Sequence, residues 1–325
     1  MADILNNIII KHELKSMISK FKQFAYFARF ALISRFGSKY KKPLISSFKL
    51  TNRCTLKCLH CPFWRSNETL ELKYDETVAI LRKLHKDGVK IVIFEGGEPL
   101  IWKDRENNKD IHDIIAMARE LFYYICVTTN GTVELSNVES DIIFVSIDGL
   151  QKTHDAIRGK SFDRIIENIK ANKNSKKIIA NICISKINSK EIPELIKFLN
   201  DITFGITIQF FYPYSNVENL VISQDEKEQL LKELIKLKKE GYKILDSAAC
   251  LKKMMKNTWK CYDFLVSSVE PDGKTYYGCY LKNKVDNVSC RDCGFAVHCE
   301  ISLAYSLNFD ALNSAAKIFK YFLFL

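Results

Sequence analysis

Three cysteines with the spacing C-x3-C-x2-C fall within eight residues of this 325-residue chain, at Cys54, Cys58 and Cys61. Thiolates are the protein ligands of iron–sulfur clusters, and they also bind zinc. A four-iron cluster held by only three cysteines keeps one iron open, and an open metal position can bind a substrate or cofactor. In a zinc site, His60 would be the fourth ligand. The spacing alone leaves both kinds of metal site open.

A second set of cysteines lies further along the sequence. It comprises Cys261, Cys279, Cys290, Cys293 and Cys299. The C-x2-C pair within this set is typical of structural zinc, although thiolates also hold iron–sulfur clusters. Eight of the eleven cysteines therefore have ligand-like spacing, and no cleavable signal peptide is expected. Both observations favour metal binding in a reducing cytosol over a secreted disulfide scaffold.

Strand-like and helix-like segments that could position these residues alternate six times between residues 45 and 239. Strands are expected at 45–51, 90–94, 123–128, 142–146, 177–185 and 206–211. Among the helices between them, one is expected to begin at an N-cap Asp75 and to end at Gly88, and another to begin with a capping box of Asn188 and Glu191. Such alternation predicts an α/β fold with a parallel sheet, and active sites on parallel barrels lie at the carboxyl ends of the strands.

Several groups with chemical potential directly follow these strands. They are Gly96-Gly97-Glu98-Pro99 after the second strand, Asn130 after the third, and Ser146, Asp148 and then Arg158 after the fourth. Glycines let a backbone approach a ligand closely, and arginine can bind a carboxylate with its planar fork. The alternative is ordinary turn chemistry, because Asn-Gly and Asp-Gly pairs are common in turns.

The C-x3-C-x2-C motif after the first strand, together with GGEP after the second, resembles the signature of radical S-adenosylmethionine (radical SAM) enzymes. The resemblance implies a partial (β/α)6 TIM-like barrel and a [4Fe-4S] cluster on Cys54, Cys58 and Cys61. In that family the open iron binds SAM, and one electron cleaves SAM to a 5′-deoxyadenosyl radical that abstracts hydrogen from the substrate. No side chain is expected to act as a catalytic acid, base or nucleophile.

The same resemblance implies the residues that contact SAM. They are Gly96, Gly97, Glu98, Pro99, Asn130, Ser146, Asp148 and Arg158. In the family, GGEP contacts the SAM amino group, and strings similar to those after the third and fourth strands hold the ribose and the carboxylate. Asn130, Ser146 and Asp148 would then be hydroxyl partners, and Arg158 would clamp the carboxylate.

The second cysteine set resembles the SPASM and twitch extensions of radical SAM enzymes, which carry auxiliary [4Fe-4S] clusters. This chain departs from the full pattern, because position 303 is leucine and no cysteine follows Cys299. Five cysteines can fully ligate one such cluster but not two. One auxiliary cluster is expected, and which four of the five cysteines ligate it stays open. His298 is expected to be incidental.

Residues 1–44 carry nine Lys or Arg against two acidic residues, which is +7 of the net charge of +11. Apolar residues at three- and four-residue steps predict an amphipathic helix here: Met17, Phe21, Phe24, Ala28, Ala31 and Leu32. This helix would either pack on the barrel or lie on an anionic membrane surface. It is not expected to span a membrane, and neither is the apolar stretch 315–325, which is too short. Nucleic-acid binding is not expected, because the charge is local and no such motif appears.

Four regions are therefore expected: a basic helical segment at 1–44, a radical SAM barrel at 45–241, a Cys-rich auxiliary region at 242–302 and an apolar tail at 303–325. The substrate is not evident, and a peptide or protein, a membrane lipid or another small molecule are all considered. Ferredoxin or flavodoxin is the expected electron donor. The expected location is the cytoplasm, with a peripheral position at the inner face of the membrane as an option. The rival hypothesis is a non-catalytic zinc scaffold or membrane adaptor.

Overall fold

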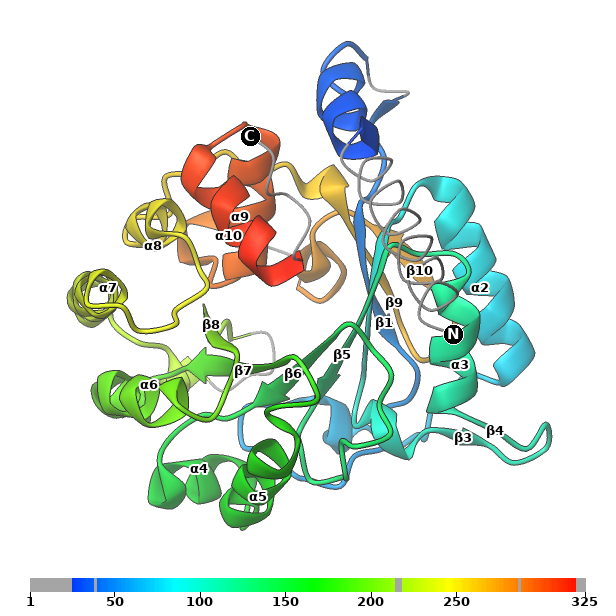
Figure 1. Cartoon of the computed structure of the whole chain (residues 1–325), viewed down its shortest axis with the longest axis horizontal. Helices are drawn as coiled ribbons and strands as arrows, with labels where there is room; N and C mark the ends of the chain where they lie inside the picture. Colours follow the sequence, from blue (N-terminus) through cyan, green and yellow to red (C-terminus); the bar gives the residue numbers. More distant parts are fainter. Residues whose placement is uncertain (1–24, 38–39, 214–217, 286–287, 320–325) are drawn as a thin grey trace, which may run out of the picture.

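The computed structural model describes residues 25–37, 40–213, 218–285 and 288–319. Its centre is a curved eight-stranded sheet in the order β10-β9-β1-β2-β5-β6-β7-β8 (Figure 1). The strands are β1 (Ile45–Lys49), β2 (Ile91–Glu95), β5 (Tyr124–Thr129), β6 (Ile142–Ser146), β7 (Ile178–Ile184), β8 (Gly205–Phe210), β9 (Val266–Val269) and β10 (Thr275–Tyr277). All neighbours from β9 to β8 are parallel, and β10 is antiparallel to β9. The six predicted parallel strands are confirmed.

Helices cover the outside of the sheet (Figure 1). They are α2 (Tyr74–Asp87), α3 (Ile111–Arg119), α4 (Gln151–Arg158), α5 (Phe162–Asn172), α6 (Ile192–Asn200) and α7 (Gln224–Lys239), followed by α8 (Ala248–Met254), α9 (Ala296–Tyr305) and α10 (Phe309–Phe319). Residues 25–33 are also helical, and β3 (Lys103–Asp104) and β4 (Lys109–Asp110) form a small separate hairpin. This arrangement is the predicted α/β fold, a partial TIM-like barrel, because right-handed crossovers place each helix outside the parallel sheet.

Strand alternation divides the core into two layers. Side chains such as Phe48 of β1 and Phe94 of β2 are fully buried against the helices. On the inner face, a second apolar cluster at the starts of the strands includes Ile91, Tyr124 and Ile142, and Phe319 of α10 packs on it. The amino-terminal end of the barrel is therefore filled, and polar residues on the inner face lie towards the carboxyl ends of the strands.

Two predicted helix starts were wrong. The N-cap of α2 is Lys73, whose backbone N–H donates to the carboxylate of Glu76 at 3.0 Å. Asp75 instead lies in the first helical turn, where its negative charge is favoured by the helix dipole. The predicted end of this helix at Gly88 is confirmed, with φ at 114°.

The predicted capping box at α6 was also wrong, because both of its residues bind other parts of the chain. Asn188 donates through Nδ2 to the carbonyl of Asp148 at 2.6 Å. Glu191 accepts from the backbone N–H of Leu150 at 2.7 Å and from the hydroxyl of Thr153 at 3.0 Å. These side chains tie the start of α6 to the loop after β6, a long-range use that local spacing does not reveal.

The predicted hairpin around Asp272-Gly273 is confirmed by the antiparallel pair β9 and β10, with Gly273 at φ 79°. The sequence did not indicate that β9 would pair in parallel with β1 and so extend the barrel sheet. At the opposite edge, the backbone N–H of Phe210 in β8 donates to the carbonyl of Gly294 at 2.9 Å. A Cβ atom at Gly294 would lie 2.1 Å from the Phe210 carbonyl oxygen, so this close approach needs glycine.

The helix at residues 25–33 packs on the barrel through its aromatic side chains. Tyr26 stacks edge-on against Tyr123 at 5.8 Å and donates to the carbonyl of Gly88 at 3.2 Å. Phe30 contacts Tyr305 at 6.4 Å between ring centroids. Of the two alternatives that the sequence leaves open, this part of the segment packs on the barrel, while residues 1–24 and 320–325 lie outside the described residues. Within the described chain, no helix is both long and apolar enough to cross a membrane.

Candidate active site

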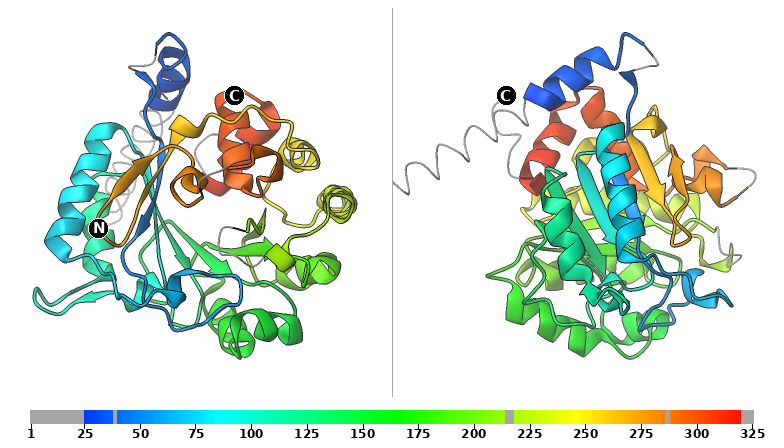
Figure 2. Two further views of the ribbon diagram at one scale, coloured as in Figure 1. Left: turned by 180° about the vertical axis from the view of Figure 1, so that it is seen from behind. Right: turned by 90° about the vertical axis from the view of Figure 1, so that its right-hand side faces the viewer.

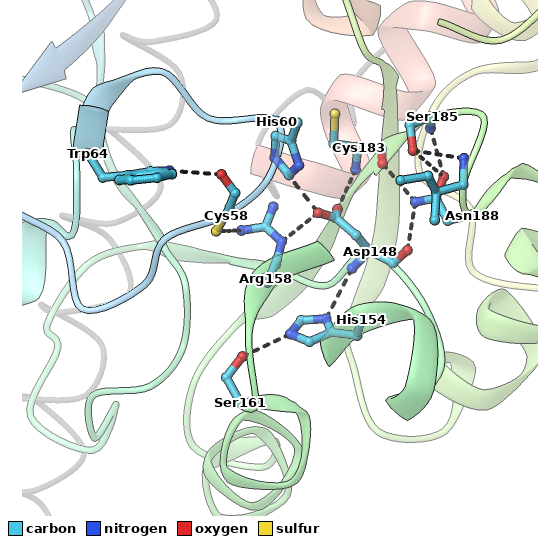
Figure 3. A network of polar contacts seen from close by, with 11 residues as sticks. Cys58, His60, Trp64, Asp148, His154, Arg158, Ser161, Cys183, Ser185 and Asn188 are labelled. Atoms are coloured by element: carbon cyan, nitrogen blue, oxygen red, sulfur yellow. Dashed lines mark hydrogen bonds and ion pairs between the residues drawn. The ribbon is translucent and has the colours of Figure 1, made fainter. Parts of the chain in front are cut away.

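The first cysteine group lies on the loop that follows β1. Cys58 is buried, and Cys54 and Cys61 are partly exposed. The indole N–H of Trp64 donates to the carbonyl of Cys58 at 2.9 Å, and the backbone N–H of Leu59 donates to the carbonyl of Ile157 at 2.8 Å. The loop is therefore held both by its own residues and by helix α4 (Figure 3).

The glycine pair after β2 packs directly against this cysteine loop. A Cβ atom at Gly96 would lie 2.4 Å from the carbonyl oxygen of Thr51, and one at Gly97 would lie 2.0 Å from that of Arg53. The backbone N–H of Gly97 donates to the Thr51 carbonyl at 2.7 Å, and that of Glu98 donates to the Arg53 carbonyl at 2.8 Å. Any side chain at Gly97 would therefore push the loop that carries the cysteines.

Glu98 is fully buried, and its carboxylate is engaged by protein groups. It accepts from the hydroxyl of Thr129 at 2.7 Å, the backbone N–H of Asn130 at 2.7 Å and that of Leu100 at 3.1 Å. Burial raises the pKa of Glu98 to about 7, although these hydrogen bonds oppose the shift. The side chain joins the β2 loop to the end of β5, and its predicted contact with SAM stays a prediction. The neighbouring Pro99 is also buried.

Asn130 connects the end of β5 to the first cysteine. Its Nδ2 donates to the hydroxyl of Thr55 at 2.8 Å and lies 3.6 Å from the sulfur of Cys54. Its Oδ1 accepts from the backbone N–H of Thr132 at 2.9 Å. The amide is thus fixed as a donor towards a sulfur, and such bonds favour the thiolate form that ligates metal. The last residue of β6, Ser146, is 9% exposed.

Asp148 and Arg158 form a buried ion pair beside the second cysteine (Figure 3). The Nε of Arg158 lies 2.5 Å from Oδ2 of Asp148, and its Nη1 lies 3.9 Å from the sulfur of Cys58. The Oδ1 of Asp148 also accepts from the backbone N–H of Cys183 at 2.9 Å. Burial alone would raise the pKa of Asp148, but Arg158 foremost holds it below its ordinary value. A fixed positive charge therefore faces the cysteine loop.

Two histidines around Asp148 were not predicted as SAM contacts. The Nε2 of His60 lies 3.9 Å from Oδ2 of Asp148, and Nδ1 of His154 accepts from the Asp148 backbone N–H at 3.3 Å. Burial lowers the pKa of each imidazole to about 4, so both are neutral at pH 7. The second nitrogen of His154 lies 3.2 Å from the hydroxyl of Ser161. His154 thus orients the Asp148 loop, and it lies in α4, a helix that was not expected from the sequence.

The second cysteine set is divided by the fold. Burial, followed by the neighbouring thiols of Cys279, Cys261 and Cys290, raises the pKa of Cys293 to about 12. Cys261, Cys279 and Cys290 are therefore near enough to Cys293 for their charges to act on it. Cys299 is set apart, because it is completely buried in the main core and its thiol donates to the carbonyl of Cys250 at 3.9 Å. Sequence spacing could not separate it from the others.

His298 lies beside these four cysteines. Its Nδ1 is 4.0 Å from the sulfur of Cys261, and the residue is 5% exposed. Burial lowers the pKa of this imidazole to about 4. Whether it is incidental, as expected, stays a prediction.

Both cysteine groups fit iron–sulfur clusters in the chemistry of their donors. At the first group, three thiols share one loop, and Asn130 and Arg158 point donors at two of the sulfurs. Burial raises the pKa of Cys61 to about 11, so its thiolate requires the positive charge of bound metal. Across the described residues, no three His, Cys, Asp or Glu side chains converge as ligands of a single ion do. A multi-atom cluster keeps its cysteines further apart than zinc does, because its inorganic core lies between them.

Comparisons with known proteins point to one family. Residues 48–199 match the family model described as the radical SAM superfamily. The chain is 32% identical over 214 residues to a probable GTP 3′,8-cyclase of Pyrococcus abyssi. The aligned region covers 58% of this chain and 67% of that protein. It is 30% identical over 176 residues to the Fe-coproporphyrin III synthase of Methanosarcina barkeri. That aligned region covers 50% of this chain and 42% of the synthase.

The chain belongs to the radical SAM superfamily. Membership of this family implies a [4Fe-4S] cluster and SAM as cofactors. It spans only about two-fifths of the length of the first curated relatives that it matches, at 42% and 41%. The family match ends before the second cysteine set, whose resemblance to SPASM extensions stays a prediction.

Solved structures share the fold. SuiB of Streptococcus suis bound to the precursor peptide SuiA has a TM-score of 0.60 at 19% identity, covering 77% of this chain and 62% of that one. The enzyme anSMEcpe bound to AdoMet and the Kp18Cys peptide has a TM-score of 0.58 at 17% identity, covering 84% of both chains. At this identity the likeness supports the barrel architecture alone.

Proposed function

We propose that SAM is cleaved at a [4Fe-4S] cluster held by Cys54, Cys58 and Cys61. When bound, the cluster supplies one electron to SAM, and the resulting 5′-deoxyadenosyl radical takes hydrogen from an unreactive carbon of the substrate. The observation that carries this proposal is the close packing of the Gly96-Gly97 loop on the cysteine loop. It brings the two most specific motifs of the sequence together at the carboxyl ends of β1 and β2.

The chain's own residues would bind and orient SAM. The backbone of Gly96 to Pro99 borders the cysteine loop, and Asn130 and Ser146 end the next strands of the sheet. Arg158 would attract the SAM carboxylate through the guanidinium edge that Asp148 does not use. In this proposal Asp148 and Glu98 position their neighbours, because both carboxylates are engaged within the protein.

The test is product analysis after anaerobic reconstitution with iron and sulfide, with SAM and dithionite added. We expect 5′-deoxyadenosine and methionine from the wild type and none above background from Cys58→Ala. Cys126→Ala is a matched control, since Cys126 lies in the inner apolar cluster away from the loop. A wild-type protein that carries the cluster and binds SAM, yet forms no 5′-deoxyadenosine with any substrate, would count against the proposal.

We further propose that residues 45–241 form the SAM-binding unit and residues 242–302 hold one auxiliary [4Fe-4S] cluster. Its ligands would be Cys261, Cys279, Cys290 and Cys293, because these are the thiols that influence one another. Cys299 would be a core residue. Four thiolates close a cluster completely, so this site would transfer electrons or support the fold and would not bind SAM.

A peptide is the substrate class we propose, ahead of a lipid. Lys49 on the inner face of β1 pairs with Glu95 of β2 at 3.3 Å and with Glu270 at 3.2 Å, and Lys284 pairs with Glu270 at 2.8 Å. These charged side chains on the inner face suit a polar substrate, whereas an acyl chain needs apolar surroundings. SkfB of Bacillus subtilis, a relative that is 27% identical over 167 residues, is named as a maturation protein of the sporulation killing factor.

The substrate class can be tested in the same assay. A substrate accelerates formation of 5′-deoxyadenosine above the rate with SAM alone. We expect stimulation by a pool of unmodified peptides and none by lipid vesicles, and the reverse result would reject the peptide. Reduced ferredoxin or flavodoxin should replace dithionite.

We also propose a cytoplasmic location with peripheral contact to the inner membrane face. All eleven cysteines are free in the structure, as a reducing compartment would keep them. The basic segment of residues 1–44 suits an anionic surface. Fractionation of the cells that make the protein tests this directly, since a peripheral protein leaves the membrane fraction in high salt.

A further inference from the structure

The first and last described segments of the chain, which begin at residue 25 and end at residue 319, meet at one end of the barrel. Tyr26 and Phe27 pack on Tyr123, at 5.8 and 6.1 Å between ring centroids. Phe319, the last residue of α10, packs on the next residue, Tyr124, at 4.9 Å. Both contacts fall at the start of β5, so residues 25 and 319 reach the amino-terminal end of the barrel. Nothing in the sequence places these two segments together.

This end lies opposite the cysteine loop. In the right-hand view of Figure 2, the helix at residues 25–33 lies at the top, and the segment that follows β1 lies at the bottom. The strands run between these ends, because β1 leads from the first end to the cysteine loop.

Exposed apolar side chains gather at this end. Arg35 donates to the carbonyl of Tyr305 at 2.7 Å, and Ser34 bonds the Tyr305 hydroxyl at 3.0 Å, so the segment after the helix lies beside the turn between α9 and α10. Among the described residues, twelve large apolar side chains are exposed, and half of them lie on these segments or at the amino end of β8. We call these six the basal face: Leu32, Phe36, Tyr40, Phe204, Leu307 and Phe309.

The basal face is bordered by unpaired positive charge. Arg29, Lys41 and Lys317 are exposed and take part in no ion pair within the described part of the chain. Three acidic side chains at the same end are paired with basic ones, whereas the exposed Glu120 and Asp201 take part in no ion pair within the described part of the chain. The pairs are Asp87 with Lys83, Asp141 with Arg119 and Glu139 with Lys176.

The adjoining segments continue this composition. Residues 1–24 contain four lysines against two acidic residues, and residues 320–325 read KYFLFL. Residues 25 and 319, where the described chain meets these two segments, lie at the same end of the barrel as the basal face. An anionic bilayer surface attracts this combination, because aromatic rings lie at the headgroup level and basic side chains contact phosphates.

We propose that the basal face binds the surface of an anionic lipid bilayer. This inference refines the peripheral position proposed above and is independent of SAM cleavage. A second copy of the chain is disfavoured as the occupant, because two such faces would bring like charges together. Binding by this face directs the carboxyl ends of the strands away from the membrane. The substrate would then reach the cysteine loop from the aqueous side, which agrees with a peptide and not with a membrane lipid.

Vesicle co-sedimentation of the reconstituted protein tests the surface. We expect binding to phosphatidylcholine vesicles that contain phosphatidylglycerol, and little binding to phosphatidylcholine alone. The double variant Phe36→Ser with Phe309→Ser, whose side chains are 78% and 71% exposed, should weaken binding at least about tenfold. The matched control is Ile187→Ser with Val297→Ser, at 46% and 42% exposed, which should bind like the wild type.

Three outcomes would overturn the proposal. The first is no preference for anionic vesicles, and the second is equal binding by the basal and control variants. The third is a concentration-dependent dimer in analytical ultracentrifugation that the basal variant abolishes, since that would assign the face to a second copy. Formation of 5′-deoxyadenosine is measured for each variant, so failure of the surface is distinguished from failure of the enzyme.

Orientation has its own readout. A tryptophan introduced by Phe36→Trp should be quenched by brominated lipids in anionic vesicles, beyond the quenching of the wild-type protein. The natural Trp64, beside Cys58 on the cysteine loop, should contribute no quenching. Equal quenching of wild type and variant would reject the proposed orientation.

Discussion

The two cysteine groups of this protein are built in different ways. The first occupies one short loop after β1, and residues from β2, β5 and α4 surround it with fixed donors and close backbone contacts. The second gathers thiols from separate irregular segments, and Cys261 and Cys290 are exposed. A contiguous motif can be recognised from its spacing, whereas a dispersed one needs the fold to show which members meet. Experiments on each group can test whether the two have the different roles proposed for them.

The largest effect is expected from Gly97→Ala. The added Cβ atom would lie 2.0 Å from the Arg53 carbonyl oxygen, so the cysteine loop must move. A displacement of about 1 Å commonly costs about 100-fold in rate, and we expect at least that loss of 5′-deoxyadenosine. Gly37→Ala is the matched control, because neither glycine has a positive φ and the added Cβ at Gly37 would meet only Tyr40, at an ordinary contact distance of 3.7 Å. Equal activities of the two variants would mean that the glycine packing does not hold the site.

The second experiment compares Cys293→Ala with Cys299→Ala. The first should remove the auxiliary cluster, about four iron atoms per chain, while the second should keep it. Cys299→Ala should instead lower the free energy of unfolding by roughly 1 kcal/mol, because it truncates a fully buried side chain. Iron and sulfide analysis with thermal melting checks both. Iron loss only in Cys299→Ala would reverse the assignment of the ligands.

The third experiment addresses the donors around the first group. Arg158→Gln removes a charge-assisted contact, so the dissociation constant for SAM should rise about 10- to 100-fold. Asp148→Asn should have a smaller effect in the same direction, because Asp148 acts by holding Arg158 at 2.5 Å. The exposed Lys160→Gln is the control. Equilibrium dialysis with SAM measures all three, and unchanged affinity in Arg158→Gln would exclude the proposed clamp.

The smallest effect concerns a buried acid away from both groups. Asp246 is 4% exposed and accepts from the backbone N–H of Ile208 at 2.9 Å, and burial raises its pKa to about 7. A carboxyl with a raised folded pKa contributes stability fully below its unfolded pKa near 4, and that stability is lost as pH rises through 7. Asp246→Asn removes this loss and keeps an acceptor for Ile208.

Melting temperatures between pH 5.5 and 8 test this sign. We expect the free energy of unfolding of Asp246→Asn to rise relative to that of the wild type as pH rises, by on the order of 2 kcal/mol at pH 8. The exposed Asp75→Asn on α2 should show no such trend. If the variant instead loses stability relative to the wild type at high pH, the fold stabilises the Asp246 carboxylate as an anion.

The comparison also shows what the sequence could predict. The six parallel strands followed from apolar periodicity, because each strand is buried between helices and an inner face. The first cysteine loop followed from its spacing. The pairing of β9 with β1, the separation of Cys299 from its neighbours, and the long-range bonds of Asn188 did not follow, since each depends on a partner far along the chain.

The Asp148 network lies between these cases. Asp148 and Arg158 were named as SAM contacts from the strings that carry them, but the sequence could not show that they bind each other. It also could not show that His154 accepts a hydrogen bond from the backbone N–H of Asp148, because a buried neutral histidine has no distinctive local pattern.

The filling of the barrel by α10 has a kinetic consequence. Phe319 and Ile318 pack on the inner cluster at the amino-terminal end, so small molecules cannot pass through the barrel. Whatever enters from the carboxyl end must leave by the same route. Methionine, 5′-deoxyadenosine and the altered substrate would then share one exit, so a product that stays bound there would slow the next turnover.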